Sequence, residues 1–189
     1  MHMKEWDKAL KSFDKARLLD PNNPDPWENI GFILRSRKEL AEALKCYNIS
    51  ILLYPDNAGI WLNKGNLYDD LKQMEKAKNC YTKATKLYPK YEIAWLYLGD
   101  VLHSLKEFPE AIYCDTQVIS MNPKEDRAYY NRARSRIGNN EIELGLGDLQ
   151  KAIELKRGWI KISEKDHDFD SVRSNNAYQS LVSKRVNFR

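Results

Sequence analysis

The feature that most constrains this chain is a sequence repeat of thirty-four residues. Trp27, Trp61 and Trp95 lie thirty-four positions apart. Residues of unrelated chemistry follow the same offset: Gly31, Gly65 and Gly99; Ala43, Ala77 and Ala111; Pro55, Pro89 and Pro123. A constant offset of this length, shared by such different residues, predicts an array of repeated units of helical size.

Apolar residues within each unit recur at helical spacing, which predicts an all-α chain. Each unit has two helices separated by a short polar break. The expected segments are 1–23 (second helix of an incomplete N-terminal repeat), 24–57 (first repeat), 58–91 (second repeat), 92–125 (third repeat), 126–159 (fourth, degenerate repeat) and 160–189 (C-terminal cap).

Small residues at matched places predict that the two helices of a unit cross closely, with aromatic residues filling the flanking space. Glycine in a helix interior costs about 1 kcal/mol relative to alanine, so a recurring glycine indicates a contact that offsets this cost. The pattern weakens towards the C-terminus. Asp115 stands where earlier repeats have Tyr47 and Tyr81, and Gly145 stands where they have alanine.

The order of tryptophan, glycine, tyrosine or leucine, alanine, aromatic residue, alanine and proline resembles the tetratricopeptide-repeat family. This resemblance implies an α-solenoid of antiparallel helix pairs stacked in a right-handed superhelix, whose concave face binds a partner peptide or protein. Residues 168–182 also resemble the closing segment of such arrays, which implies a C-terminal capping helix over the last pair. The capping residues would be Phe169, Val172, Tyr178 and Leu181.

The resemblance also implies which side chains line the concave groove. They are the first-helix residues that point away from the tryptophan–glycine face. The predicted groove residues are Asp25, Glu28, Phe32, Arg35, Leu62, Asn66, Asp69, Ile93, Leu96, Asp100, His103, Arg127, Tyr130 and Arg134.

Two properties of this predicted groove suggest its partner. Its apolar members are expected to be exposed, and exposed apolar patches usually mark binding sites. Its charge changes from acidic in the first three repeats to basic at Arg127 and Arg134 in the fourth. We therefore expect a protein or peptide ligand with apolar anchors, whose acidic portion lies towards the fourth repeat.

Composition excludes several classes of protein. A net charge of +4 lacks the dense basic stripe of a nucleic-acid binder, so nucleic acid is an unlikely partner. No apolar run approaches the ~20 residues that a membrane span needs, so no membrane association is expected. Cys46, Cys80 and Cys114 share the repeat offset, which places them too far apart to pair. They are expected to be packing residues of a cytoplasmic, reducing compartment.

No motif predicts catalysis, a metal site or a cofactor, so we expect a protein that is not an enzyme. Asp166, Asp168 and Asp170 mimic the start of a calcium loop, but the turn glycine and the bidentate glutamate are missing, which favours a helix-capping, solvated turn. His103 and His167 lack partners at zinc spacing.

Two other functions remain open at this point. The array could be a helical-repeat RNA binder, or it could self-assemble as a homo-oligomer through its open N-terminal half-repeat. The basic cluster on the first helix of the fourth repeat is expected to be a solvated face or a site for an acidic partner. Its members are Arg127, Arg132, Arg134 and Arg136.

Overall fold

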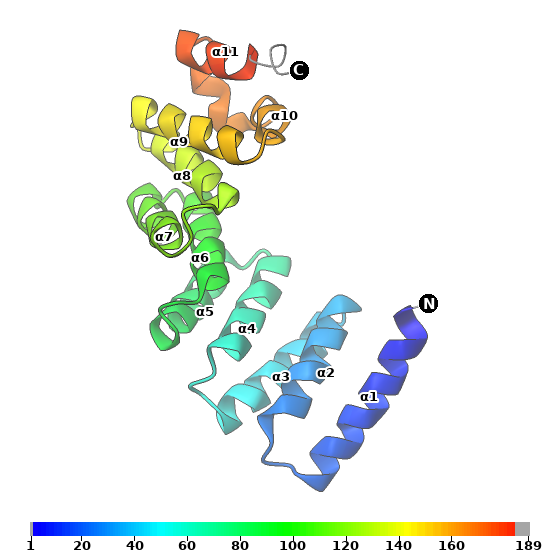
Figure 1. The fold of residues 1–189 in the computed structure, drawn as a ribbon. Helices are drawn as coiled ribbons and strands as arrows, with labels where there is room; N and C mark the ends of the chain where they lie inside the picture. The colour runs from blue at the N-terminus through cyan, green and yellow to red at the C-terminus, as the bar shows by residue number, and fades with distance from the viewer. Residues whose placement is uncertain (1, 184–189) are drawn as a thin grey trace. The chain divides into compact units, whose positions relative to one another are not determined.

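The computed structural model describes residues 2–183, and within that range its regular elements are all helical (Figure 1). The predicted all-α fold of stacked helix pairs is confirmed. The elements are α1 (His2–Leu19), α2 (Pro24–Ser36), α3 (Leu40–Leu53), α4 (Ala58–Asp70), α5 (Met74–Leu87), α6 (Glu92–Ser104), α7 (Phe108–Met121), α8 (Asp126–Gly138), α9 (Ile142–Leu155), α10 (Trp159–Ser163), the 3-10 helix η1 (His167–Val172) and α11 (Asn176–Ser183).

The chain forms two compact halves, Met1–Ala94 and Trp95–Arg189. In the N-terminal half α2 packs on α3 and α4 on α5, while α3 also contacts α4. In the C-terminal half α8 packs on α9 and also contacts α7. There α6 meets α7 through the rings of Trp95 and Tyr113, whose centroids lie 5.9 Å apart edge to face.

Each pair turns at a residue in the left-handed backbone region. Lys38, Lys72, Lys106 and Asn140 have φ values of 65°, 58°, 62° and 64°, and they keep the thirty-four-residue offset. Around the first of these turns the Lys38 amide donates to the Arg35 carbonyl oxygen at 2.9 Å. The next amide, that of Glu39, donates to the Leu34 carbonyl oxygen at 2.9 Å. These bonds satisfy carbonyl groups that the end of the first helix leaves open.

Prolines end the second helix of the first three repeats. Tyr54, Tyr88 and Asn122 each precede a proline, and their φ and ψ angles are close to −140° and +85° in every case: −141° and 83°, −134° and 89°, −136° and 88°. A proline ring disfavours the helical conformation of the residue before it. The sequence therefore fixes where these helices stop.

The recurring glycine receives an aromatic ring from the second helix. A Cβ atom on Gly65 would lie 2.5 Å from Cε1 of Tyr81, and one on Gly31 would lie 2.8 Å from Cε1 of Tyr47. Both tyrosines are fully buried. The predicted close contact is confirmed, but in these two repeats the ring itself lies on the glycine rather than beside it.

The last repeat achieves its close crossing differently. A Cβ atom on Gly145 of α9 would lie 3.0 Å from the carbonyl oxygen of Ala133 in α8, so here backbone approaches backbone. The segment that follows covers this pair. Phe169, Val172, Tyr178 and Leu181 are buried in one apolar cluster with residues of α8 and α9, as the capping prediction required. The remainder of the predicted cap, 184–189, lies outside the described residues.

The three cysteines are buried and free, as predicted. Burial raises the pKa of the Cys80 thiol to about 11 and that of Cys114 to about 12. Among the described residues, no helix combines the length and the apolar character needed to cross a membrane.

Candidate functional site

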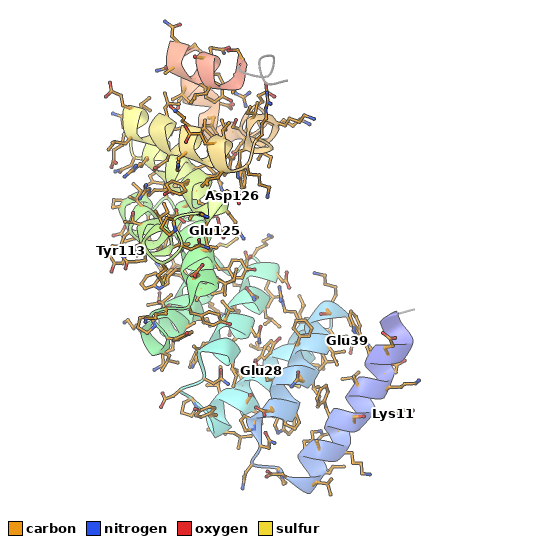
Figure 2. All side chains as sticks on the ribbon, in the orientation of Figure 1. Lys11, Glu28, Glu39, Tyr113, Glu125 and Asp126 are labelled. Atoms are coloured by element: carbon orange, nitrogen blue, oxygen red, sulfur yellow. The ribbon has the colours of Figure 1, made fainter. Side chains whose placement is uncertain are left out.

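The first helices of the N-terminal half, α2 and α4, lie side by side and form one surface, which we call the α2–α4 face. Asn63 Nδ2 donates to Glu28 Oε1 at 2.8 Å, and Arg35 Nε donates to Asp70 Oδ2 at 2.7 Å. Figure 2 shows Glu28 on α2. Phe32 stands between Glu28 and Arg35 on the same side of α2 and is 50% exposed. An aromatic ring is thus presented to solvent between polar groups.

The polar residues predicted for this face differ in their exposure and in their hydrogen-bond partners. Asp25 is exposed, and Glu28 and Asp69 are half-buried. Burial raises the pKa of Glu28, and the nearby charge of Asp25 raises it further. Asn66 accepts a hydrogen bond from the hydroxyl of Tyr81 at 2.8 Å, which ties the face to the ring on Gly65.

The prediction that Leu62 is an exposed anchor is wrong, because Leu62 is only 7% exposed. The reason is the number of neighbours that surround its helix. α4 contacts α2, α3 and α5, so more than one side of α4 is buried. An argument from one apolar stripe assumes a helix with a single buried face. Arg35 is likewise not a free cation, since it pairs with Asp70.

In the C-terminal half, the chain's own C-terminal segment covers the first-helix face of α8. The hydroxyl of Tyr130 donates to Asp166 Oδ2 at 2.7 Å, and its ring stacks on Trp159 with centroids 4.1 Å apart. The ring of Phe169 also packs against Tyr130, at 5.5 Å between centroids. Tyr130 is 3% exposed, so the prediction that it is an exposed groove residue is wrong.

The same segment contacts two further predicted groove residues, Arg134 and His103. Arg134 Nε donates to Asp168 Oδ2 at 2.6 Å and lies 3.3 Å from Asp166 Oδ2. Nε2 of His103 lies 2.9 Å from the same Asp168 oxygen. The hydrogen bond from His103 and the charge of Arg134 hold the pKa of Asp168 well below its usual range, against the opposing effect of burial. Arg134, where an acidic partner was predicted to bind, is therefore already paired with acidic side chains of the same chain.

Arg127 is also paired. It binds Asp100 Oδ2, and Asn131 Nδ2 donates to the other oxygen of Asp100 at 2.8 Å. Burial nevertheless raises the pKa of Asp100, since desolvation outweighs the charge of Arg127. Of the remaining predicted residues, Ile93 is half-buried, and Leu96 is only 5% exposed, which contradicts its expected exposure.

The other two arginines of α8 share one buried carboxylate. Arg132 contacts Asp148 through Nε and Nη2, at 2.8 and 2.7 Å, and Arg136 Nη1 donates to Asp148 Oδ2 at 2.7 Å. Together with the pairs of Arg127 and Arg134, these contacts turn the predicted basic cluster into internal ion pairs. The expectation of a freely solvated face is therefore wrong, and the site for an acidic partner stays a prediction.

Ser135, His103 and Asp168 form a chain of polar contacts that resembles a hydrolytic triad. Ser135 Oγ lies 3.1 Å from His103 Nδ1, and Asp168 lies on the other ring nitrogen. Ser135 is fully buried, however, so its hydroxyl cannot reach a substrate. A nucleophile must meet the reacting atom, and this arrangement instead fixes the cap to α6 and α8.

The three aspartates that mimic a calcium loop point to different partners. Asp166 Oδ1 accepts from the Asp168 amide at 3.1 Å and caps η1, which confirms the helix-capping expectation. Asp170 pairs with Arg173 at 2.6 Å. Asp168 is not the solvated group that was expected, because it faces His103 and Arg134. No group of three or more metal-ligating side chains forms a site within the described residues.

One buried group was missed by sequence reasoning. Asp115 is 0% exposed, and neither of its carboxylate oxygens has a hydrogen-bond partner. Its Oδ1 would lie 3.1 Å from a Cβ atom on Gly99, in the place that Tyr81 occupies on Gly65. Burial raises its pKa well above the ordinary value, with Asp100 adding to the effect. The break in the repeat at this position was the available signal.

Comparison with known proteins agrees with this geometry. Residues 58–91 match the family model described as Tetratricopeptide repeat. The crystal structure of YrrB, described as "a TPR protein with an unusual peptide-binding site", has 19% identity and a TM-score of 0.79, over 93% of this chain and 91% of that one. No match is found among curated protein sequences.

Structures of MamA are similar as well. One has 22% identity and a TM-score of 0.75, over 85% of this chain and 94% of that one. MamA from Desulfovibrio magneticus RS-1 has 22% identity and a TM-score of 0.75, over 85% of this chain and 89% of that one. At these identities the likeness concerns the fold. Residues 58–91 therefore match a tetratricopeptide repeat, and the fold of stacked helix pairs is similar to that of YrrB and MamA.

Proposed function

We propose that this protein is a non-catalytic interaction scaffold that binds a peptide or protein segment on its α2–α4 face. Its fold supports this proposal, because such stacked helix pairs present broad surfaces to partners. YrrB, a protein of the same fold, is described as having a peptide-binding site. The free, buried cysteines also agree with the reducing, cytoplasmic location that is part of this proposal.

The observation that carries the proposal is the position of Phe32. Its ring is half exposed on a helix face that packing has otherwise made polar. A large aromatic side chain gains free energy when a partner covers it, at roughly 25 cal/mol per Å² of apolar area. Aromatic residues of this kind dominate the energetics of protein interfaces.

The structure gives no support to the RNA-binding alternative. The arginines of α8 are held by carboxylates of the chain, and the α2–α4 face carries Asp25, Glu28 and Asp69, which would repel phosphates. An affinity for RNA that fell steeply with added salt would nevertheless restore this alternative.

One observation favours self-assembly as a second candidate. Ala43, Tyr47 and Ser50 of α3 are fully buried, whereas their equivalents in α1, Ala9, Phe13 and Ala16, are half-buried. A second copy that packed on α1 would complete this layer. Sedimentation velocity at several protein concentrations, repeated with Phe13→Glu, would detect such a dimer and its loss.

Selection from a displayed peptide library tests the main proposal. We expect enriched peptides to bind the wild-type protein and to lose most of their affinity for Phe32→Glu. Leu52→Glu is the matched control, because Leu52 is 81% exposed on the second helix α3 of the same half. Peptides that bound wild-type protein and Phe32→Glu equally would contradict binding at the α2–α4 face.

A further inference from the structure

The charges of the α2–α4 face define the kind of partner it accepts. We infer that this face binds a basic segment with an apolar anchor, an inference that rests on the interaction function proposed above. Asp25, Glu28 and Asp69 form no ion pair among the residues that the structure describes. Arg35 of the face pairs with Asp70, whose other oxygen lies 3.9 Å from Lys38 Nζ. The face is therefore net acidic in a chain whose net charge is +4.

Local helix stability does not account for these carboxylates. Asp25 lies in the first turn of α2, where a negative charge is favourable. Asp69 lies in the last turn of α4, where the helix dipole disfavours an acid, and that turn contains no basic residue. Glu28 loses water through burial and gains only an amide donor, Asn63. A cation supplied from outside would stabilise both of these groups.

The C-terminal half shows how a first-helix face of this protein is filled when the ligand is part of the chain. There the carboxylates of Asp166 and Asp168 meet Arg134, while Phe169 and Trp159 pack against the ring of Tyr130. The ligand thus combines charges opposite to those of the face with an aromatic contact. On the α2–α4 face the charges are the opposite of those on α8. Here the face carries the carboxylates, so the matching partner segment would carry the cations.

Phe32 supplies the apolar part of the same site. It lies one helical turn from Glu28 on the same side of α2, so a side chain packed on its ring also lies near that carboxylate. A lysine or arginine over an aromatic face gains a further electrostatic attraction. Charge complementarity and the exposed ring therefore select the same occupant, a basic and apolar protein segment.

Fluorescence anisotropy with three labelled peptides tests this inference. The peptides share the same leucine and tryptophan positions and carry lysine and arginine, glutamate, or glutamine at the positions between. We expect the basic peptide to bind wild-type protein most tightly, with an affinity that falls as salt is added. The triple variant Asp25→Asn, Glu28→Gln, Asp69→Asn should bind it about three- to thirty-fold more weakly, the range expected for three partly exposed ion pairs.

The control variant changes the net charge by the same amount on the second helices and a loop of the same half. It carries Glu42→Gln, Asp56→Asn and Glu75→Gln, and we expect its affinity to stay within about twofold of wild type. Equal loss in both triple variants would overturn the inference in favour of a general charge effect. Tighter binding of the glutamate peptide would overturn it directly, while leaving the scaffold function intact. Failure of all three peptides, together with an empty library selection, would instead refute the scaffold function.

Discussion

The two halves of the molecule build the same helix pairs but hold them together with different chemistry. In the N-terminal half, Tyr47 and Tyr81 lie on Gly31 and Gly65, and the contact is apolar and repeated. In the C-terminal half the corresponding place on Gly99 is taken by Asp115. That half also contains a buried ion-pair cluster, in which Arg132 and Arg136 both contact the carboxylate of Asp148.

This difference changes what each half can do with its first-helix face. Ion pairs and the C-terminal segment occupy the face of α8, which buries Tyr130 and neutralises Arg134. The face of α2 and α4 carries no such cover in the described residues and keeps Phe32 exposed. A buried ion pair is geometrically demanding, because its desolvation cost is offset only when its partners are correctly placed. The face of α8 is thus covered within the chain, whereas Phe32 on the face of α2 and α4 stays exposed.

The largest effect is expected from removing the anchor of the cap. Phe169→Ala deletes a fully buried ring from the cluster around Tyr130 and should lower the free energy of unfolding by about 3–5 kcal/mol. Urea denaturation measures this change. Leu144→Ala is the control, because Leu144 of α9 is 56% exposed and should shift stability by under about 0.5 kcal/mol. A similarly small effect of Phe169→Ala would show that the segment is not a structural cap.

The next effect separates the two kinds of glycine contact. Gly65→Ala places a methyl group against the ring of Tyr81 and should cost about 1–3 kcal/mol. Gly99→Ala meets no atom closer than Asp115 Oδ1 at 3.1 Å, with Cβ of Cys114 at 3.5 Å, and should cost less. A Cβ atom on Gly147 would meet nothing within 4 Å beyond its own helix. Gly147→Ala should therefore raise the free energy of unfolding by up to about 1 kcal/mol, because alanine favours the helix. Thermal unfolding of the three variants should preserve this order; equal losses for Gly65 and Gly99 would erase the distinction.

The pH dependence of stability should show two opposing contributions from the C-terminal half. The pKa of Asp115 is raised in the folded state, so its contribution is present below the ordinary value of about 4 and is lost as pH rises above it. The pKa of Asp168 is lowered, so its contribution is present above about pH 4 and is lost as pH falls.

Urea unfolding across this range, repeated with Asp115→Asn and Asp168→Asn, separates the two. Asp115→Asn should reduce the loss of unfolding free energy as pH rises above about 4, and Asp168→Asn should reduce the loss as pH falls below it. Each change should be on the order of 1 kcal/mol, after allowance for solvent screening at Asp168. A profile that neither substitution changed would contradict the role of charge in this half.

The smallest effect tests a feature that both halves share. Lys72→Gly and Lys106→Gly relieve a left-handed backbone at the turn of their pairs, and each should raise the free energy of unfolding by up to about 1 kcal/mol. Lys83→Gly lies inside α5 and should lower it by about 1 kcal/mol. Unequal gains at the two turns, measured by urea denaturation, would show that the halves differ there as well.

Much of the fold could be predicted from the sequence, because its determinants are local or periodic. The prolines stop the second helices through the residue before them, and the recurring glycine requires a close neighbour. Phe32 was expected to be exposed, and it is. The exposure of Leu62, Leu96 and Tyr130 was predicted wrongly, because burial in a stack depends on neighbours that one helix does not encode.

The sequence by itself therefore determined the thirty-four-residue period, the helix pairs and the capping residues around Phe169. Only the tertiary structure decided which charges remain available to a partner. Asp168 lies in the segment that leaves the repeat pattern, so the pattern does not predict that it meets Arg134 and His103. Packing brings them within hydrogen-bonding distance, and there electrostatic attraction between partly desolvated groups pairs Arg134 with a carboxylate of the same chain.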